Sequence, residues 1–277
     1  MNFKAPGEIA KNACNVAIAK ANWTIGQMLI MGFLGGAYIA LAGFLATVVS
    51  QDAAKYVGVG LARFYTGAVF SMGLMLVVIG GGELFTGNCL MPMGVMSGCV
   101  TPYGMFRNWF WVYFANLIGS LTVAFLVHVS GLDVGMVGAN ALKIAANKAS
   151  LPWGQSFFRG ILCNWLVVMA VWMSMSAQDV VGKIFAIFFP IMGFVASGYE
   201  HSIANMYFIA LGILAKGDSS VVALSELSPE KLSYLSLSGY LNNLVPVTLG
   251  NIVGGVLFVA VFYFLVFKDK LVMTGNE

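Results

Sequence analysis

Two stretches decide the fold of this chain, Gly82-Glu83-Leu84-Phe85-Thr86-Gly87-Asn88 and Gly198-Tyr199-Glu200-His201-Ser202-Ile203-Ala204-Asn205. In each, a glutamate closely follows a glycine and precedes an asparagine by five residues. Both lie in apolar sequence, where an ionised side chain costs at least about 2.5 kcal/mol at the centre of a bilayer. Intramembrane ionisable groups indicate functional sites, and two in matching sequence predict one site built by two halves of a duplicated chain.

The composition is that of an integral membrane protein. Of the 277 residues, 60% are hydrophobic and 9% are charged, and the mean hydropathy is +0.88. Soluble domains carry about 25% charged residues. The net charge of +3 comes from scattered basic residues, which excludes a nucleic-acid-binding surface. The four cysteines show no CxxC pair and no metal-ligand spacing, so we expect free thiols, with no metal, cofactor or disulfide framework.

Apolar stretches long enough to cross a hydrocarbon core of about 30 Å recur along the chain. Two shorter apolar pieces, 89–100 and 203–215, directly follow the glutamate motifs. Spans two and five are therefore predicted to be broken helices, interrupted at Gly80-Gly81-Gly82 and at Ser197-Gly198. The predicted spans are 25–49, 62–84, 106–130, 155–177, 184–198 and 243–267.

The third and sixth spans also repeat, because 115–121 and 250–256 share an asparagine, two apolar residues, a glycine and a small residue. Chance similarity in apolar sequence is the alternative, and four matching pieces in the same order argue against it. We predict an all-α membrane protein with six transmembrane spans in two inverted three-span repeats, spans two and five broken. The single membrane domain divides into an amphipathic N-terminal helix (1–22), a first repeat (23–130), a connecting loop (131–154), a second repeat (155–267) and a C-terminal tail (268–277).

Basic residues are balanced between the two sides of these spans, so their total does not set the orientation. Lys4, Lys11 and Lys20 precede the first span and predict cytoplasmic termini. Apolar residues alternate with these lysines at helical spacing, which predicts a helix anchored at the interface, with a gating role as the alternative. The polar residues 216–240 are expected to form an external loop.

Glu83 and Glu200 are expected to be structural. A broken helix exposes unpaired N–H groups at the start of its second piece, where a carboxylate can be held. Both glutamates are therefore predicted to staple the breaks, and direct contact with a solute is the alternative.

His201 is the leading pore candidate, because it lies inside the second break, titrates near physiological pH and can donate hydrogen bonds. A satisfied core histidine is the alternative, and His128, near the end of a span, is expected to be interfacial. Thr86 provides a hydroxyl in the first break. Asn164 provides an amide in the apolar fourth span, with helix–helix bonding as the alternative. Lys148 suits an electrostatic funnel for anions, or is an ordinary exposed lysine.

These residues lie in motifs that resemble the signatures of the formate/nitrite transporter family. The motifs are 78–87, 160–164 with 170–172, and 197–206, and the similarity follows the whole chain in order. Val168-Met169 departs from the commoner small or cysteine-containing version of the second signature. The first break reads Phe85-Thr86-Gly87-Asn88 instead of the Thr-Ser form of dedicated formate channels, and the chain most resembles the hydrosulfide-channel branch.

The resemblance implies a homopentamer of aquaporin-like protomers in the cell inner (plasma) membrane. Each protomer would have its own pore for small anions of weak acids, namely hydrosulfide, formate and nitrite. By position, His201 is the central pore histidine with Asn164 and Thr86 beside it, and Lys148 is the vestibule lysine. The resemblance also implies apolar constrictions at Phe70, Leu74, Phe85 and Phe194.

A bare anion in a medium of low dielectric constant costs on the order of 20 kcal/mol in the idealised limit. The central histidine can lower this barrier by donating hydrogen bonds or by protonating the anion, and apolar constrictions favour the second. A proton-coupled secondary transporter of the same anions is the alternative function. A water or glycerol channel would carry paired Asn-Pro-Ala motifs and a pore arginine, which the sequence lacks, and no nucleophile motif supports an enzyme.

Overall fold

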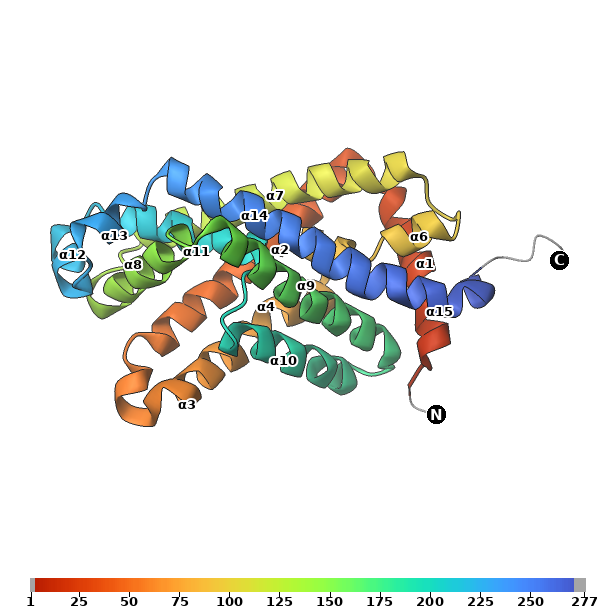
Figure 1. The fold of residues 1–277 in the computed structure, drawn as a ribbon, viewed down its shortest axis with the longest axis horizontal. Coiled ribbons are helices and arrows are strands. Elements are labelled where there is room, and N and C mark those ends of the chain that lie inside the picture. The colour runs from red at the N-terminus through yellow and green to blue at the C-terminus, as the bar shows by residue number, and fades with distance from the viewer. Residues whose placement is uncertain (1–2, 272–277) are drawn as a thin grey trace.

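The computed structural model describes residues 3–271, and this part of the chain is almost entirely helical (Figure 1). Within it, five helical segments are long and apolar enough to cross a membrane. They are α2 (Ile25–Ser50), α3 (Ala53–Phe70) with its continuation to Gly81, α7 (Pro102–Val129), α9 (Trp153–Ser176), and α14 (Leu237–Gly255) with its continuation through η2 (Val256–Val261) and α15 (Phe262–Leu271). The bent pair α11 (Ser202–Ala215) and α12 (Ser219–Ser225) forms a sixth candidate span, and α10 (Val180–Ala196) is a shorter apolar helix that precedes it. The predicted six-span fold is confirmed.

Both predicted breaks are present. The second span passes through α4 (Met72–Met75) and a π-helical turn, η1 (Leu76–Gly81), before it becomes extended and re-enters as α5 (Phe85–Asn88) and α6 (Pro92–Met96). A π-helical turn interrupts the regular α-helical hydrogen-bond pattern, and here it lies at the end of the helix, directly before the break. Gly81 (φ 95°) and Gly198 (φ 75°) each lie two residues before a motif glutamate. Their left-handed backbone favours glycine, which explains the glycine two residues before each glutamate.

Two pairs of long helices pack backbone to backbone through glycines. In the first half, a Cβ on Gly36 of α2 would collide with the Asn116 carbonyl of α7, and one on Gly119 of α7 would collide with the Phe33 carbonyl. In the second half, Gly250 and Gly254 of α14 meet the backbone of α9 in the same way. Small residues at such crossings let membrane helices approach closely, so these glycines fix the frame that surrounds the breaks.

The repeat includes one more helix than the sequence predicts. Lys148 follows Lys20 by 128 residues, and Gly160 of α9 follows Gly32 of α2 by the same number. The helix α8 (Gly135–Ala149) is therefore the counterpart of α1 (Pro6–Ala21). Each repeat thus begins with an equivalent helix that carries a lysine. The sequence pattern places these two helices outside the repeats, in residues 1–22 and 131–154. The two helices lie at opposite ends of the bundle in Figure 1, as an inverted repeat requires.

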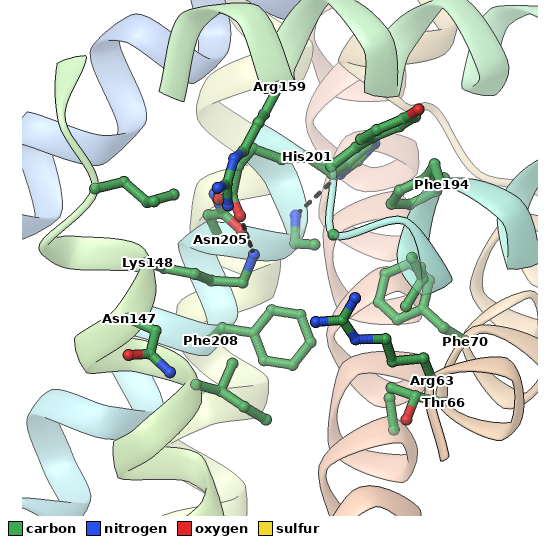
Figure 2. Close-up of a pocket in the computed structure, with 18 of the residues that line it drawn as sticks. Arg63, Thr66, Phe70, Asn147, Lys148, Arg159, Phe194, His201, Asn205 and Phe208 are labelled. Carbon is green, nitrogen blue, oxygen red and sulfur yellow. Dashed lines mark hydrogen bonds and ion pairs between the residues drawn. The ribbon is translucent and has the colours of Figure 1, made fainter. Parts of the chain in front are cut away.

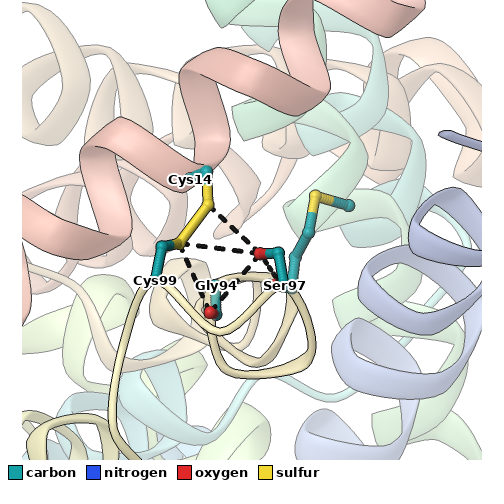
Figure 3. The surroundings of a disulfide bond; sticks show 5 residues. Cys14, Gly94, Ser97 and Cys99 are labelled. Carbon is teal, nitrogen blue, oxygen red and sulfur yellow. Dashed lines mark hydrogen bonds between the residues drawn. A yellow bond between two sulfur atoms is a disulfide. The ribbon is translucent and has the colours of Figure 1, made fainter. Parts of the chain in front are cut away.

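The amphipathic helix α1 packs against the bundle through a buried face that includes Ile9, Ala13 and Ala17. A disulfide joins Cys14 of this helix to Cys99, which follows α6 (Figure 3). The expectation of four free thiols is therefore wrong for this pair, whereas Cys89 and Cys163 are free and buried. Spacing could not reveal the bond, because the two cysteines are 85 residues apart and meet only when α1 folds against the bundle.

Residues 216–240, which are predicted to be an external loop, form a helical cap. After α11 the chain bends by 115° into α12 (Ser219–Ser225), and α13 (Pro229–Ser233) follows. Val221 and Leu235 of this segment are buried against Leu142, Ala145 and Ala146 of α8. The cap therefore fixes α8, and with it Lys148, at the end of the bundle opposite α1 and α15 (Figure 1). The predicted C-terminal tail begins within α15, and its residues 272–277 lie outside the described part.

Candidate functional site

Each break leaves a short extended segment between two helical pieces. Glu83 and Leu84 precede α5, and Glu200 and His201 precede α11. Leu84 and His201 therefore occupy equivalent positions in the two repeats, each one residue after its glutamate. The repeat is thus symmetric in its backbone and asymmetric in the side chain that it offers at the centre.

One asparagine holds each break in place. The Nδ2 of Asn251 donates to the carbonyls of Gly160 (2.8 Å) and Glu200 (3.0 Å), and its Oδ1 accepts from the Ser202 N–H (2.9 Å). Asn116 makes the same three bonds in the first half, to Gly32 (2.7 Å), Glu83 (2.8 Å) and Phe85 (3.0 Å). Both side chains are fully buried. These amides satisfy backbone groups that the broken helices expose, so they hold the breaks open at membrane depth.

The glutamate carboxylates bind side chains instead of capping the helices as predicted. Glu200 pairs with Lys148 of α8 (3.0 Å) and accepts a bond from Asn205 (2.6 Å), which also donates to Asn243 of α14 (2.7 Å). The Asn243 amide in turn donates to the Lys148 carbonyl (2.9 Å). Both glutamates therefore still fasten the breaks, but they do so by tying them to a neighbouring helix and to a lysine.

The first half repeats this cluster with Lys20 of α1. Lys20 pairs with Glu83 (2.9 Å), and Asn88 donates to Glu83 (2.6 Å) and to Asn108 (2.7 Å). Asn108 also donates to the Lys20 carbonyl (3.3 Å). Each buried carboxylate thus has a cation and an amide as partners, which is the condition for ionised groups to remain at this depth.

Three cavities adjoin the breaks. The Lys148 vestibule has a volume of about 640 Å³ and reaches Glu200 and His201 (Figure 2). The Lys20 vestibule has a volume of about 460 Å³ and reaches Glu83 and Leu84. Between them lies a central cavity of about 10 Å³, room for about one water molecule.

The residues shared by neighbouring cavities form the constrictions between them. Phe70, Phe194 and His201 line both the Lys148 vestibule and the central cavity. Leu74 and Leu84 line both the central cavity and the Lys20 vestibule. The ring of Phe194 stacks on the imidazole of His201 with centroids 5.8 Å apart, so one constriction is aromatic and the other aliphatic. The cavities therefore form one path that narrows on both sides of the centre.

The imidazole of His201 has both ring nitrogens engaged. Its Nδ1 accepts the backbone N–H of Ala204 (3.1 Å), and its Nε2 lies 2.9 Å from the Thr86 hydroxyl. A backbone amide can only donate, so Nδ1 carries no proton and the neutral ring carries its proton on Nε2. The Nε2–H therefore donates to Thr86 Oγ1, which leaves the threonine hydroxyl hydrogen free for another acceptor.

The other predicted site residues lie at different distances from this path. Lys148 lines its vestibule, with the ammonium 5.5 Å from the centre of the Phe208 ring. Asn164 is fully buried behind Thr86, where its Nδ2 donates to the Thr86 and Asn251 carbonyls. The ring of Phe85 packs on Trp109 and Tyr113 and lines none of the three cavities. Leu84 lies on the path where the resemblance implies Phe85.

His128 lies at the end of α7, where its Nδ1 is 2.8 Å from a carboxylate oxygen of Asp133. It is far along the chain from either break and lines none of the cavities described above. Its partly exposed position agrees with the expected interfacial role.

The sequence reasoning missed several members of the two clusters. From the sequence, Lys20 is predicted to orient and anchor the first helix, and Asn108 of α7 and Asn243 of α14 have no predicted role. A signal for them exists, because Asn108 precedes Asn116 by eight residues and Asn243 precedes Asn251 by the same eight. The 128-residue offset between Lys20 and Lys148 is a second such signal.

The described geometry agrees with comparisons to known proteins. Residues 7–265 match the family model described as formate/nitrite transporter. A probable formate transporter of Methanothermobacter thermautotrophicus is 42% identical, over 97% of this chain and 99% of its own. A formate channel of Haemophilus influenzae is 39% identical, over 93% of this chain and 92% of its own.

Solved structures show the same fold. A pentameric formate channel with formate bound superposes with a TM-score of 0.78 at 35% identity, covering 88% of this chain and 98% of that one. An ion channel of the same family superposes with a TM-score of 0.77 at 31% identity, covering 94% and 98%. Nearly the full length of each relative is therefore represented in this chain.

Proposed function

The chain belongs to the formate/nitrite transporter family, and within that family we propose that it is a channel for small monovalent anions of weak acids. Membership in a transporter family confirms that the chain is not an enzyme. Three of the four relatives described above are named for formate, which makes formate the first candidate, with nitrite and hydrosulfide next. We keep hydrosulfide among the anions to be tested because the first break lacks the Thr-Ser form of dedicated formate channels.

The observation that carries this proposal is the path through the breaks. Two vestibules, each with a lysine, lead to a central cavity that is lined by His201, whose imidazole is bonded to the Thr86 hydroxyl, and that lies between apolar constrictions. A cationic entrance concentrates anions, and a dry constriction with few donors rejects large hydrated ions. A small anion fits a cationic entrance followed by a narrow constriction, because protein hydrogen-bond donors can replace its few bound water molecules one at a time.

The hydrogen bonds of His201 favour donation over the proton transfer that the sequence suggested. An imidazolium would need a proton on Nδ1, and this atom already accepts the Ala204 N–H. Proton transfer from the neutral ring would leave an imidazolate, which is far too basic to form readily. We therefore propose that the Thr86 hydroxyl, which accepts the Nε2–H of His201 and is thereby oriented, stabilises the passing anion as a hydrogen-bond donor.

We further propose that the chain works as a homopentamer in the cell inner membrane, with a pore in each protomer and with cytoplasmic termini. The pentameric structural relative supports the assembly. The lysines of α1 support the orientation, because basic residues before the first span favour the cytoplasmic side.

Flux into proteoliposomes tests the proposal with formate, nitrite and hydrosulfide across a pH series. Three proteins are compared: wild type, His201→Asn and His201→Phe. Asparagine can accept the Ala204 N–H and still offer an amide donor, but it does not titrate. We expect His201→Asn to keep formate flux and its pH profile, and His201→Phe to lose flux.

A loss of flux in His201→Asn equal to that in His201→Phe would contradict the proposal that a hydrogen-bond donor without a titratable group is sufficient at this position. The driving force separates the channel from the proton-coupled alternative. Formate flux that follows an imposed membrane potential without a pH gradient supports conduction of the anion, whereas flux that requires the pH gradient supports coupling. A wild-type protein that passes none of the three anions refutes the proposed function.

A further inference from the structure

The Lys148 vestibule carries more positive charge than passage through the centre requires. Four cationic side chains line it, from α3, α8, α9 and α13 in turn: Arg63, Lys148, Arg159 and Lys231. Glu200 is the one acidic side chain among its lining residues, and this carboxylate is already paired with Lys148. Three cations therefore remain without a carboxylate partner in a cavity that leads to the His201 constriction.

The two vestibules differ in the kind of cation that they offer. Three lysines, Lys4, Lys20 and Lys183, line the Lys20 vestibule, and none of its lining residues is an arginine. The Lys148 vestibule adds two guanidinium groups to its lysines. A guanidinium presents parallel N–H donors in a planar fork, whereas an ammonium acts as a point charge. The difference breaks the repeat symmetry at the entrance, as His201 and Leu84 break it at the centre.

Both guanidinium groups are available to a ligand. Arg63 makes no hydrogen bond or ion pair with another described residue, and Arg159 has a single long hydrogen bond to Gln155 (3.5 Å). Figure 2 shows the Arg63 side chain directed from α3 into the pocket, with its guanidinium between the rings of Phe70 and Phe208 in this view. Lys231, in contrast, already donates to the Ser150 hydroxyl (2.7 Å). Arg63 is therefore the freest donor next to the aromatic constriction.

We propose that Arg63, supported by Arg159, forms a capture site for planar anions with two oxygens on one atom, the carboxylate and nitrite type. The site rests on the proposed function and adds to it an entrance that selects by shape on one face of the membrane. Two parallel N–H donors match the two oxygens of formate or nitrite and give paired charge-assisted hydrogen bonds. Hydrosulfide and chloride have no second acceptor atom at that spacing, so they gain only the attraction of the charge.

The site predicts a one-sided effect. An anion that enters from the Lys148 vestibule is first bound at Arg63 and then passes to the Thr86 hydroxyl beside His201. An anion from the other side meets only ammonium groups, so its apparent affinity is lower and depends less on its shape. Exposed cations are also screened by salt, so the part of the capture due to charge weakens as ionic strength rises.

The test compares Arg63→Lys, Arg63→Gln and the control Lys55→Gln. Lys55 is an exposed cation on α3 that does not line the vestibule. Lys55→Gln therefore removes the same charge as Arg63→Gln without changing the vestibule. Initial flux is measured from the Arg63 face at low and high salt, with formate, nitrite and hydrosulfide. We expect Arg63→Lys to raise the half-saturating concentration of formate and nitrite by about threefold to tenfold and to leave hydrosulfide unchanged. We expect Arg63→Gln to impair all three anions at low salt, and Lys55→Gln to behave as wild type.

Two results would overturn the capture site. One is an Arg63→Lys variant that handles formate as wild type does, because charge alone would then suffice. The other is an Arg63→Gln variant that cannot be told from Lys55→Gln. Formate-dependent thermal stabilisation of the solubilised protein gives a readout that needs no conduction: Arg63→Lys should reduce it. A wild-type protein that is stabilised by formate and yet passes no anion keeps the site and refutes the proposed function.

Discussion

Replacing either break-holding asparagine by alanine should destabilise the protein by the same amount and affect conduction differently. Asn251→Ala removes three hydrogen bonds and leaves the Gly160 and Glu200 carbonyls and the Ser202 N–H without that partner. The Gly160 carbonyl lies inside α9 and keeps its helical hydrogen bond, whereas a buried polar group without any partner costs about 1–3 kcal/mol, so the other two groups together give about 2–6 kcal/mol. Asn116→Ala exposes three equivalent groups and should cost the same to within about 1 kcal/mol.

The two variants act on different residues of the path. The bonds of Asn251 flank His201, and those of Asn116 flank Leu84. We expect Asn251→Ala to lower formate flux per folded protomer, because the imidazole loses its fixed position. We expect Asn116→Ala to loosen the aliphatic constriction, so that flux persists with poorer discrimination between anions.

Unfolding of the purified protein by titration with a denaturing detergent measures the stability difference, and proteoliposome flux measures conduction. Asn140→Ala is the matched control, because this half-buried amide makes two bonds, to Thr47 and Ser50, where water can replace it. It should cost about 1 kcal/mol. The reasoning is refuted if Asn116→Ala and Asn251→Ala differ by more than about 2 kcal/mol, or if both are as mild as the control.

Three further predictions follow from the same contacts. Thiol-specific labelling of the folded protein should modify no cysteine before reduction and two after it, since Cys14 and Cys99 are joined and the other two are buried; two labels before reduction would contradict the bond. Thr86→Val keeps the side-chain shape but removes the hydroxyl beside His201. It should slow formate flux about tenfold, which is equivalent to about 1.4 kcal/mol. Unchanged flux would show that this hydroxyl has no part in the mechanism. Lys148→Met leaves the buried Glu200 carboxylate without its cation and should destabilise the protein by about 3–5 kcal/mol. A second change, Glu200→Gln, should restore most of that stability. If it restores none, the ion pair is not the source of the lost stability.

The fold could be predicted because its signals are local. A run of apolar residues has to match the thickness of the bilayer, and a glycine next to a glutamate marks a backbone that cannot remain helical. The repeat of these signals gave the number of spans and the position of both breaks. The cysteine pair and the role of α1 depended instead on contacts between distant segments, which no local pattern contains.

The difference between Phe85 and Leu84 has a simple physical origin. Leu84 is the last extended residue of the break and Phe85 is the first residue of α5, so the two neighbouring side chains leave the backbone in different directions. A shift of one residue therefore separates a side chain on the path from one that packs in the core. The repeat itself contained the correction. Leu84 follows Glu83 as His201 follows Glu200, and superposing the two motifs on their glutamates places the leucine opposite the histidine.

The size of the central cavity has a consequence for transport kinetics. A space of about 10 Å³ between two constrictions cannot hold two anions, and even one must displace the surrounding side chains. Within the central cavity there is therefore no second position from which an arriving anion could push its predecessor out, as ions do in pores with several adjacent sites. Solute on the far side should then slow entry from the near side by simple competition for one position. Mixtures of two permeant anions should give rates between those of the pure solutions, with no minimum at an intermediate ratio.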